Sequence, residues 1–330
     1  MKRVLSSVLV VLLMTTALVV LSSGAKRQKR APEVVYSSDG SEVRIYSTEV
    51  EDTLRLMVIS DTHLWLSDER EEPFRKYSAR MAGAYNETRH FKTGEKTNPQ
   101  RELVRVLQLA QKRGADAVAM LGDMVSYPSE RGVEWLKEVL DTTAIPYYYT
   151  CGNHDWHYEG MEGSRQSLRS KWREERLSPL FRGQNQDAYT AQIKGVRLFF
   201  VDESTYEVQP QQLAAVEAER KSGRPFLLFH HIPFYAPGRP VGYGIGHPDW
   251  GAKTDDGYQF ERRERWAEGG HKQVDYRFYD AVTTAPNLLA SFAGHVHLYG
   301  VDIINGRPHY TVEANFRGGY YFVTVMPLKR

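Results

Sequence analysis

The chain has 330 residues, 41% apolar and 12% aromatic, which suits one large or two ordinary folded domains and excludes a disordered protein. Its formal net charge is +2, and without Lys2 and Arg3 the basic residues equal the 41 acidic ones, so nothing electrostatic favours a nucleic acid or an anionic membrane as partner. The single cysteine, Cys151, excludes an internal disulfide framework.

The first 25 residues have the pattern of an export signal. A basic start precedes an apolar run from Val4 to Leu21, and small residues then allow cleavage after Ala25. The run is also long enough to anchor the chain in a membrane, and the basic cluster at 26–30 favours keeping that side in the cytoplasm. We expect residues 1–25 to be a cleaved signal or an anchor. The protein is then exported, periplasmic or secreted, and meets a membrane only through this segment.

The rest of the chain divides into a short leading segment and one domain. Residues 26–52 are interpreted as a linker followed by an edge strand, Val43 to Tyr46, and residues 53–330 alternate buried apolar segments with helical patterns. Strands are predicted at 54–60, 117–121, 147–151, 188–193, 196–201, 225–229 and 288–293, with further strands in 301–325. Helices are predicted at 99–113, 133–140, 209–221 and 273–284. This alternation predicts an α/β fold with two half-sheets facing each other and helices covering the sheets.

Two long insertions, residues 64–100 and 235–272, interrupt this pattern. Both contain aromatic residues, among them Trp65, Phe74 and Tyr85 in the first. Insertions of this length are typically functional lids or disordered segments. The aromatic side chains could form a substrate wall, or equally the small core that holds each insertion in place.

Residue types that bind metals follow five predicted strands, at the point where each strand ends. Ligands bind at the carboxyl ends of the strands in open α/β sheets, so these side chains should converge although they span most of the chain. Adjacent strand residues face opposite ways, so only one of His230 and His231 can point into such a site; we choose His231, with His230 as the fallback. The five segments are Asp61-x-His63, Gly122-Asp123, Gly152-Asn153-His154-Asp155, His230-His231 and Gly294-His295-x-His297.

The mixture of carboxylate, amide and imidazole groups suits two ions chosen from Mn, Fe and Zn. Two such ions can hold a bridging hydroxide and clamp the oxygens of a phosphoryl displacement, which requires one carboxylate that both ions share. Asp123 suits that position because it stands alone at its strand end. His154 is the candidate proton donor to the leaving group, and Asp155 could orient it or raise its basicity.

This set of segments resembles the calcineurin-like metallophosphoesterase superfamily, from about residue 54 to residue 325. The resemblance implies a four-layer αββα sandwich of two mixed β-sheets flanked by helices, with a dinuclear metal centre. It implies that His154 is the acid that contacts phosphate. By the same resemblance, one ion is held by Asp61, His63, Asp123 and His297, and the other by Asp123, Asn153, His231 and His295.

Departures from the family pattern reduce the number of family branches that this chain resembles. The run Met-Val-Ser-Tyr-Pro follows Gly122-Asp123, where Ser/Thr protein phosphatases have Asp-Arg-Gly. Ser126 stands where purple acid phosphatases carry their iron-binding tyrosine, so no purple chromophore is expected. The chain is similar to the cyclic-nucleotide phosphodiesterase-like and general phosphoesterase branches.

The sequence hypothesis is a dinuclear-metal-dependent phosphoesterase that hydrolyses a small phosphomonoester or phosphodiester through a metal-bridging hydroxide. Its expected partner is the small phosphorylated substrate. One alternative is a catalytically weak metal-binding scaffold, which the intact His154 and Asp155 argue against. A second is a nuclease using the same metal centre, which the balanced charge disfavours. The sequence indicates no oligomeric state.

Overall fold

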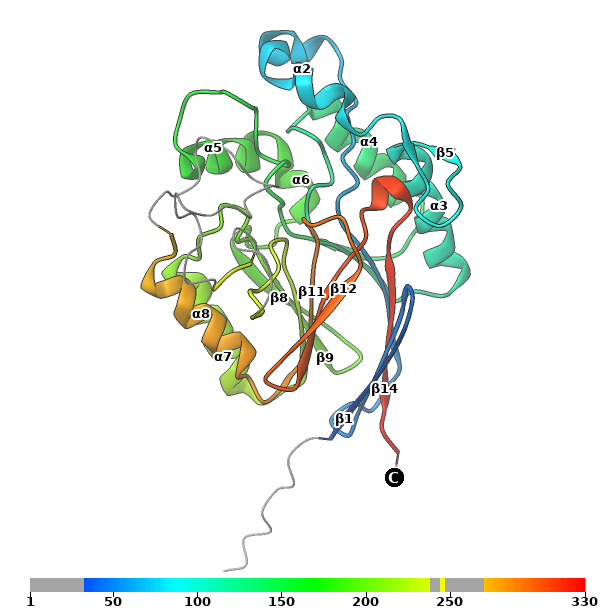
Figure 1. Cartoon of the computed structure of the whole chain (residues 1–330), viewed down its shortest axis with the longest axis vertical. Helices are drawn as coiled ribbons and strands as arrows, with labels where there is room; N and C mark the ends of the chain where they lie inside the picture. The colour runs from blue at the N-terminus through cyan, green and yellow to red at the C-terminus, as the bar shows by residue number, and fades with distance from the viewer. Residues whose placement is uncertain (1–32, 238–243, 247–269, 330) are drawn as a thin grey trace, which may run out of the picture. The chain divides into compact units, whose positions relative to one another are not determined.

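The computed structural model describes residues 33–237, 244–246 and 270–329 (Figure 1). The predicted export segment and most of the insertion at 235–272 lie outside these residues. Among the described helices, none is both long and apolar enough to cross a membrane.

The first sheet has six strands and contains both parallel and antiparallel pairs. β3, β6 and β7 run parallel to one another, whereas β14 pairs antiparallel with β3 and parallel with β2. The predicted edge strand, Val43 to Tyr46, is part of β2 and is not at the edge. Residues assigned to the linker form β1, which pairs with β2 and takes the edge position. The strand order is β1 (Val34–Asp39), β2 (Glu42–Ser47), β14 (Tyr321–Pro327), β3 (Leu54–Ile59), β6 (Ala117–Met120), β7 (Tyr147–Tyr149).

The second sheet also has six strands, with parallel strands inside and an antiparallel hairpin at each edge. The hairpins turn at Lys194-Gly195 and at Asn305-Gly306. Each of these four residues has a positive φ, the conformation that two-residue hairpin turns require. The strand order is β12 (Gly300–Ile304), β13 (Arg307–Thr311), β11 (Leu288–Ala293), β10 (Phe226–Phe229), β9 (Val196–Val201), β8 (Ala188–Ile193).

Four helices complete the layers. Asn98 and Ser129 cap α3 and α4 by accepting a backbone N–H with their side chains, as residues of this type favour helix starts. In Figure 1, α3 and α4 lie toward the opposite side of the molecule from α7 and α8. The four are α3 (Pro99–Lys112), α4 (Glu130–Asp141), α7 (Pro210–Ser222) and α8 (Gln273–Thr283).

Three apolar cores fill the spaces between these layers. In β3, Leu56 and Val58 face the core between the sheets, while Met57 and Ile59 face the core under α3 and α4. This two-residue alternation is what a strand between two cores requires. A third core lies between the second sheet and α7 and α8. The predicted four-layer αββα sandwich is therefore confirmed.

The insertion at 64–100 is folded rather than an irregular loop. Phe74 stacks on Tyr158 with ring centroids 5.1 Å apart and meets the buried Trp172 edge-on at 5.2 Å. Part of its aromatic content therefore forms a small core against residues 158–181. The insertion contains a 3₁₀ helix (Glu69–Phe74), α2 (Arg75–Ala84), β4 (Thr88–Arg89) and β5 (Lys96–Thr97). Residues 158–181 contain α5 (Arg165–Trp172), a π-helical turn (Arg173–Leu177) and α6 (Ser178–Phe181).

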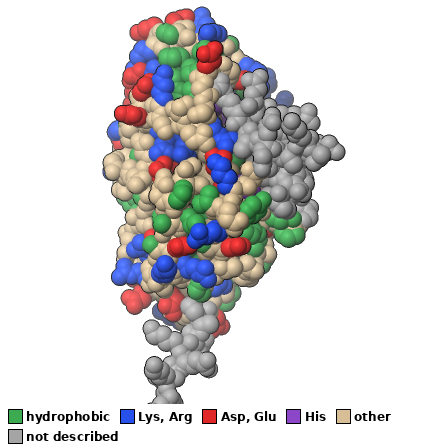
Figure 2. Space-filling view, turned by 90° about the vertical axis from the view of Figure 1, so that its left-hand side faces the viewer, with side chains coloured by type: hydrophobic (Ala, Val, Ile, Leu, Met, Phe, Trp, Pro, Cys, Tyr) green, Lys and Arg blue, Asp and Glu red, His purple; other side chains and the backbone are tan. Residues whose placement is uncertain are grey.

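The surface agrees with the balanced charge of the sequence. On the face shown in Figure 2, Lys and Arg side chains are interspersed with Asp and Glu side chains and with apolar groups. Such a mixed surface gives no single-sign field to steer a polyanion onto this face.

Candidate metal centre

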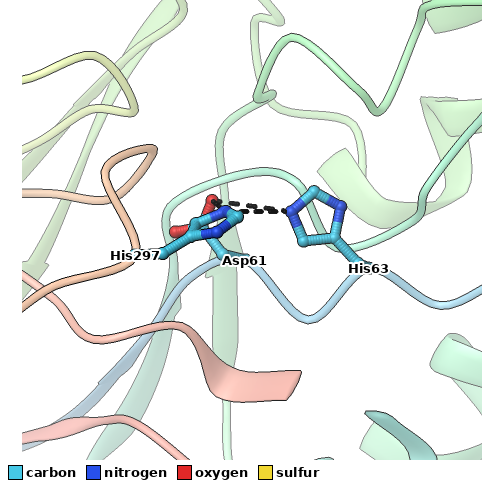
Figure 3. A group of neighbouring side chains, drawn as sticks. All are labelled: Asp61, His63 and His297. Carbon is cyan, nitrogen blue, oxygen red and sulfur yellow. Dashed lines mark hydrogen bonds and ion pairs between the residues drawn. The ribbon is translucent and has the colours of Figure 1, made fainter. Parts of the chain in front are cut away.

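One group of predicted ligands joins the loops after β3 and β11. The Nε2 atom of His297 lies 3.3 Å from Asp61 Oδ1 and 3.2 Å from the Nε2 atom of His63. Figure 3 shows these three side chains pointing toward one another, Asp61 and His63 from the loop after β3 and His297 from the loop after β11. Asp61 and His63 are fully buried, while the side chain of His297 is 26% exposed and so marks the side open to solvent.

A second group lies beside the first and joins the loops after β6, β7, β10 and β11. The Oδ1 atom of Asn153 is 3.1 Å from both His231 Nε2 and His295 Nδ1. Asp123 Oδ2 is 3.3 Å from His231 Nε2 and 3.8 Å from His63 Nε2. Asp123 therefore faces both groups, as a shared carboxylate must. All seven predicted ligand residues come together at this edge of the sheets.

Hydrogen bonds outside the site indicate which ring nitrogens face into it. His231 Nδ1 lies 2.8 Å from the Leu121 carbonyl, which can only accept, so Nδ1 carries a proton and Nε2 faces Asp123. His295 Nε2 is bonded to the hydroxyl of the buried Tyr206, which leaves Nδ1 directed at Asn153. Partners of this kind orient imidazoles in metal sites.

The protonation of the site also suits cations. Burial lowers the pKa of His63 and of His295 to about 3, so both imidazoles are neutral, the form that binds metals. Burial acts to raise the pKa of Asp123, but the neighbouring His231 and His154 lower it by more, so the pKa lies well below its usual value. Asp123 in turn outweighs the effect of burial on His231 and raises its pKa to about 10. A cation replacing the proton on His231 would satisfy the same carboxylate.

Backbone strain is concentrated at these ligands. Ten non-glycine residues in the described part of the chain have a positive φ, and half of them are predicted ligands. Each such conformation costs about 1–3 kcal/mol and persists only where the surroundings enforce it, which is common at functional sites. The five are Asp61, His63, Asp123, His295 and His297, with φ between 51° and 71°.

Glycines beside the ligands allow the loops to approach each other. A Cβ on Gly122 would lie 2.1 Å from the backbone nitrogen of Gly152, and one on Gly294 would lie 1.8 Å from Ser60 Oγ. Both distances are far below van der Waals contact, so no larger residue fits without displacing a loop. These glycines bring the β6 loop against the β7 loop, and the β11 loop against the β3 loop.

The sequence model of the calcineurin-like phosphoesterase family matches residues 54–299, well over half of the chain. The chain belongs to this family. It is therefore a metallophosphoesterase, a hydrolase of phosphoric ester bonds, and the family implies a dinuclear metal centre. A comparison with curated proteins finds no match.

Several solved structures are similar to this chain at low sequence identity. A dimetal phosphatase from Danio rerio superposes with a TM-score of 0.50 and 14% identity, covering 81% of this chain and 91% of that chain. A purple acid phosphatase, PPD1, from yellow lupin (Lupinus luteus) has a TM-score of 0.49 and 12% identity, covering 84% of this chain and 47% of that chain. TT1561 of Thermus thermophilus has a TM-score of 0.42 and 11% identity, covering 80% of this chain and 91% of that chain. The likeness to the Danio rerio protein concerns the fold.

In this phosphoesterase His154 lies beside the ligand groups, but Asp155 does not orient its ring. His154 Nδ1 faces the Ser126 carbonyl at 3.3 Å, and its backbone N–H donates to Asp123 Oδ1 at 2.7 Å. The buried Asp155 accepts instead from the backbone N–H groups of Val125 at 3.0 Å and Gly152 at 2.8 Å. These contacts do not support the orienting role expected of Asp155, because its carboxylate ties the β6 loop to the β7 loop. Its expected effect on the basicity of His154 stays a prediction.

Asp155→Asn should therefore lower stability. The amide group keeps one acceptor but turns an NH₂ donor toward a backbone N–H, which leaves a buried group unsatisfied at a cost of about 1–3 kcal/mol. Urea denaturation measures the change, with the exposed Asp52→Asn as the matched control. A variant as stable as the wild type would contradict this assignment.

Two residues after β9 support the phosphoesterase site and were missed by the sequence analysis. The choice of His231 over His230 agrees with their positions, because His230 Nδ1 faces Glu203 Oε1 at 3.1 Å, away from the ligand groups. The same Glu203 oxygen accepts the backbone N–H groups of His231 at 2.9 Å and Ile232 at 2.6 Å. Applying the strand-end rule to β9 would have found Glu203, whereas nothing in the sequence pairs Tyr206 with His295.

Tyr206→Phe should weaken metal binding without unfolding the protein. The variant keeps the ring and removes the hydroxyl that orients His295, and changes to such partners cost about 10–100-fold in metal affinity. Metal titration by calorimetry measures the loss. Tyr299→Phe is the matched control, because its hydroxyl bonds the Tyr320 carbonyl outside the site. Equal affinities in the two variants would contradict the role of Tyr206.

Proposed function

We propose that this protein hydrolyses a small phosphomonoester or phosphodiester with the help of two metal ions drawn from Mn, Fe and Zn. The observation that carries the proposal is the shared position of Asp123 between two buried groups of oxygen and nitrogen ligands. The mixture of carboxylate, amide oxygen and neutral imidazole suits these metals.

The residues divide into two ligand sets that meet at Asp123. When bound, the ions supply Lewis acidity, which makes a nucleophile available near neutral pH and offsets the charge of the phosphate. The protein contributes fixed ligand directions, since the carbonyl of Leu121 and the hydroxyl of Tyr206 hold two of the imidazoles. One set is Asp61, His63, Asp123 and His297; the other is Asp123, Asn153, His231 and His295.

His154 is the proposed proton donor to the leaving oxygen. Its ring packs edge-on against His63 with centroids 4.8 Å apart. Its Nδ1 faces the Ser126 carbonyl, so the proton given to the substrate would come from Nε2. The residue is only 6% exposed, so it sits at the inner end of any path to the ligands. A proton donated from this position neutralises the charge that develops on the leaving oxygen, without the need for bulk water in the site.

The test is hydrolysis of 4-nitrophenyl phosphate and bis(4-nitrophenyl) phosphate by the full chain, with Mn, Fe or Zn added in turn. We expect metal-dependent release of nitrophenol that chelation abolishes. Bound metal without turnover on any phosphate ester would support a scaffold instead. Cleavage of single-stranded oligonucleotides in preference to both esters would support a nuclease.

We also propose that the enzyme works outside the cytoplasm. The proposal rests on the basic, apolar and small-residue pattern of residues 1–25, which lie outside the described part of the chain. Fractionation of cells that express the full chain, followed by amino-terminal sequencing, distinguishes cleavage after Ala25 from anchoring. Recovery of the intact chain in the cytosol would contradict the proposal.

A further inference from the structure

Two aromatic side chains pack directly against one ligand group. The Tyr85 ring stacks on the His63 imidazole with centroids 4.1 Å apart, and the Phe316 ring meets His63 edge-on at 5.7 Å and His297 edge-on at 5.2 Å. Tyr85 ends α2 in the insertion at 64–100, whereas Phe316 belongs to a short 3₁₀ helix, Asn315–Arg317. Residues more than 200 positions apart thus meet over the same imidazole.

The two rings form one continuous surface, which we call the aromatic wall. Their centroids are 4.7 Å apart, and the Tyr85 ring also lies edge-on to His154 at 6.4 Å and to His297 at 5.7 Å. The wall therefore extends from the partly exposed His297 to the proposed proton donor. A leaving group protonated by His154 must lie next to it.

The Phe316 side of the wall is fixed to the ligand loop. The backbone N–H of Phe316 donates to the Asp61 carbonyl at 3.1 Å, and that of Asn315 donates to the Ser60 carbonyl at 2.9 Å. The Arg317 carbonyl accepts from the backbone N–H of Phe91, at 3.0 Å, which joins the insertion to the same helix. A surface held this closely is set at a constant distance from the ligands, as substrate selection requires.

We propose that Tyr85 and Phe316 are specificity-determining residues that favour phosphate esters whose leaving group carries a ring over esters of short aliphatic alcohols. This inference rests on the proposed function and names the substrate class of the same site. Aromatic rings pair favourably edge-to-face or offset, at centroid separations like those within the wall itself. Phe316 is buried behind the half-buried Tyr85 ring, so the apolar surface offered to a substrate is mainly that of Tyr85. A short alkyl group leaves that surface uncovered, so it gains less on binding.

The test compares phenyl phosphate with methyl phosphate, using the metal-loaded full chain. The quantity measured is the ratio of the two kcat/KM values in each variant, divided by the wild-type ratio, because this double ratio cancels the intrinsic reactivity of the esters. We expect Tyr85→Ala to lower the preference for the phenyl ester about ten-fold, the size of effect that pocket contacts give. Phe316→Ala should act in the same direction, and Tyr85→Phe should keep the wild-type ratio.

Tyr77→Ala is the matched control, because Tyr77 lies on the same helix but packs against the core under α3 and α4. It should leave the ratio unchanged. A fall in both rates with a constant ratio in Tyr85→Ala would overturn the inference and leave Tyr85 as a support of His63. Calorimetric binding of phenylphosphonate and methylphosphonate gives the same comparison without turnover. An inactive wild type that still prefers phenylphosphonate would therefore contradict the proposed function and not the wall.

Discussion

Asp123→Asn should reduce phosphoesterase activity by about a hundred-fold or more. Removing a hydrogen-bond partner of a metal ligand already costs about 10–100-fold in metal affinity or activity. Asp123 faces both ligand groups directly, so its loss should cost more. The amide keeps the acceptor for the backbone N–H of His154 while removing the charge that faces His63 and His231. The change therefore tests the shared carboxylate rather than the loop around it.

The measurement pairs kcat/KM on 4-nitrophenyl phosphate with the number of metal ions bound per chain. We expect about two ions in the wild type and fewer in the variant, as a dinuclear centre requires. Asp141→Asn is the control, because this exposed carboxylate pairs with Lys137 on the surface of α4. Unchanged activity and metal content in Asp123→Asn would rule out the proposed mechanism.

The positions of the ligands could be predicted from sequence because each depends on a local pattern. An apolar strand that ends in glycine and then in a metal-binding residue is visible in a short window, as at Gly122-Asp123 and at Gly294-His295. Parallel strands then place these ends at one edge of a sheet without further information. The two facing sheets follow from the same runs, since Leu54–Ile59 is apolar on both faces and needs a core on each side.

Roles that depend on contacts between distant segments could not be predicted in this way. Asp155 follows His154 in sequence, which suggested that it orients the imidazole, yet its carboxylate turns to the backbone of Val125 and Gly152. Tyr85 lies in an insertion with no ligand pattern and reaches His63 only because α2 folds back over the β3 loop. The positive φ values of the ligands have no signature either, because side chains other than glycine avoid that conformation.

The prediction of the edge strand in the first sheet was wrong for a different reason. No side chain of β1 is fully buried, and half of its six residues are polar, so its sequence resembles that of a linker. What makes it a strand is a hairpin with β2 through Gly40, whose φ is +55°, together with the hydroxyl of Tyr36 donating to the Leu289 carbonyl at 2.8 Å. Tertiary pairing of this kind overrides a weak local preference.

His154→Gln should slow the hydrolysis of alkyl phosphates far more than that of 4-nitrophenyl phosphate. A proton donor contributes about 10²–10⁴-fold where the leaving alkoxide is strongly basic, and little where nitrophenolate leaves unaided. Glutamine retains a side chain that can hydrogen-bond but cannot transfer a proton at neutral pH. The loss on methyl phosphate should therefore reach about a hundred-fold or more, while the loss on the nitrophenyl ester stays within about ten-fold.

The comparison also separates proton donation from electrostatic support of the site. His154 contacts Asp123 through its backbone N–H, which the substitution leaves in place, so the ligand groups should keep their metal affinity. His157→Gln, three residues along the same loop, controls for loss of a nearby imidazole. If His154→Gln slows both esters equally, the residue binds the phosphate without donating a proton, and the proton must then reach the leaving oxygen from water through the opening beside His297, where the ligand groups meet solvent.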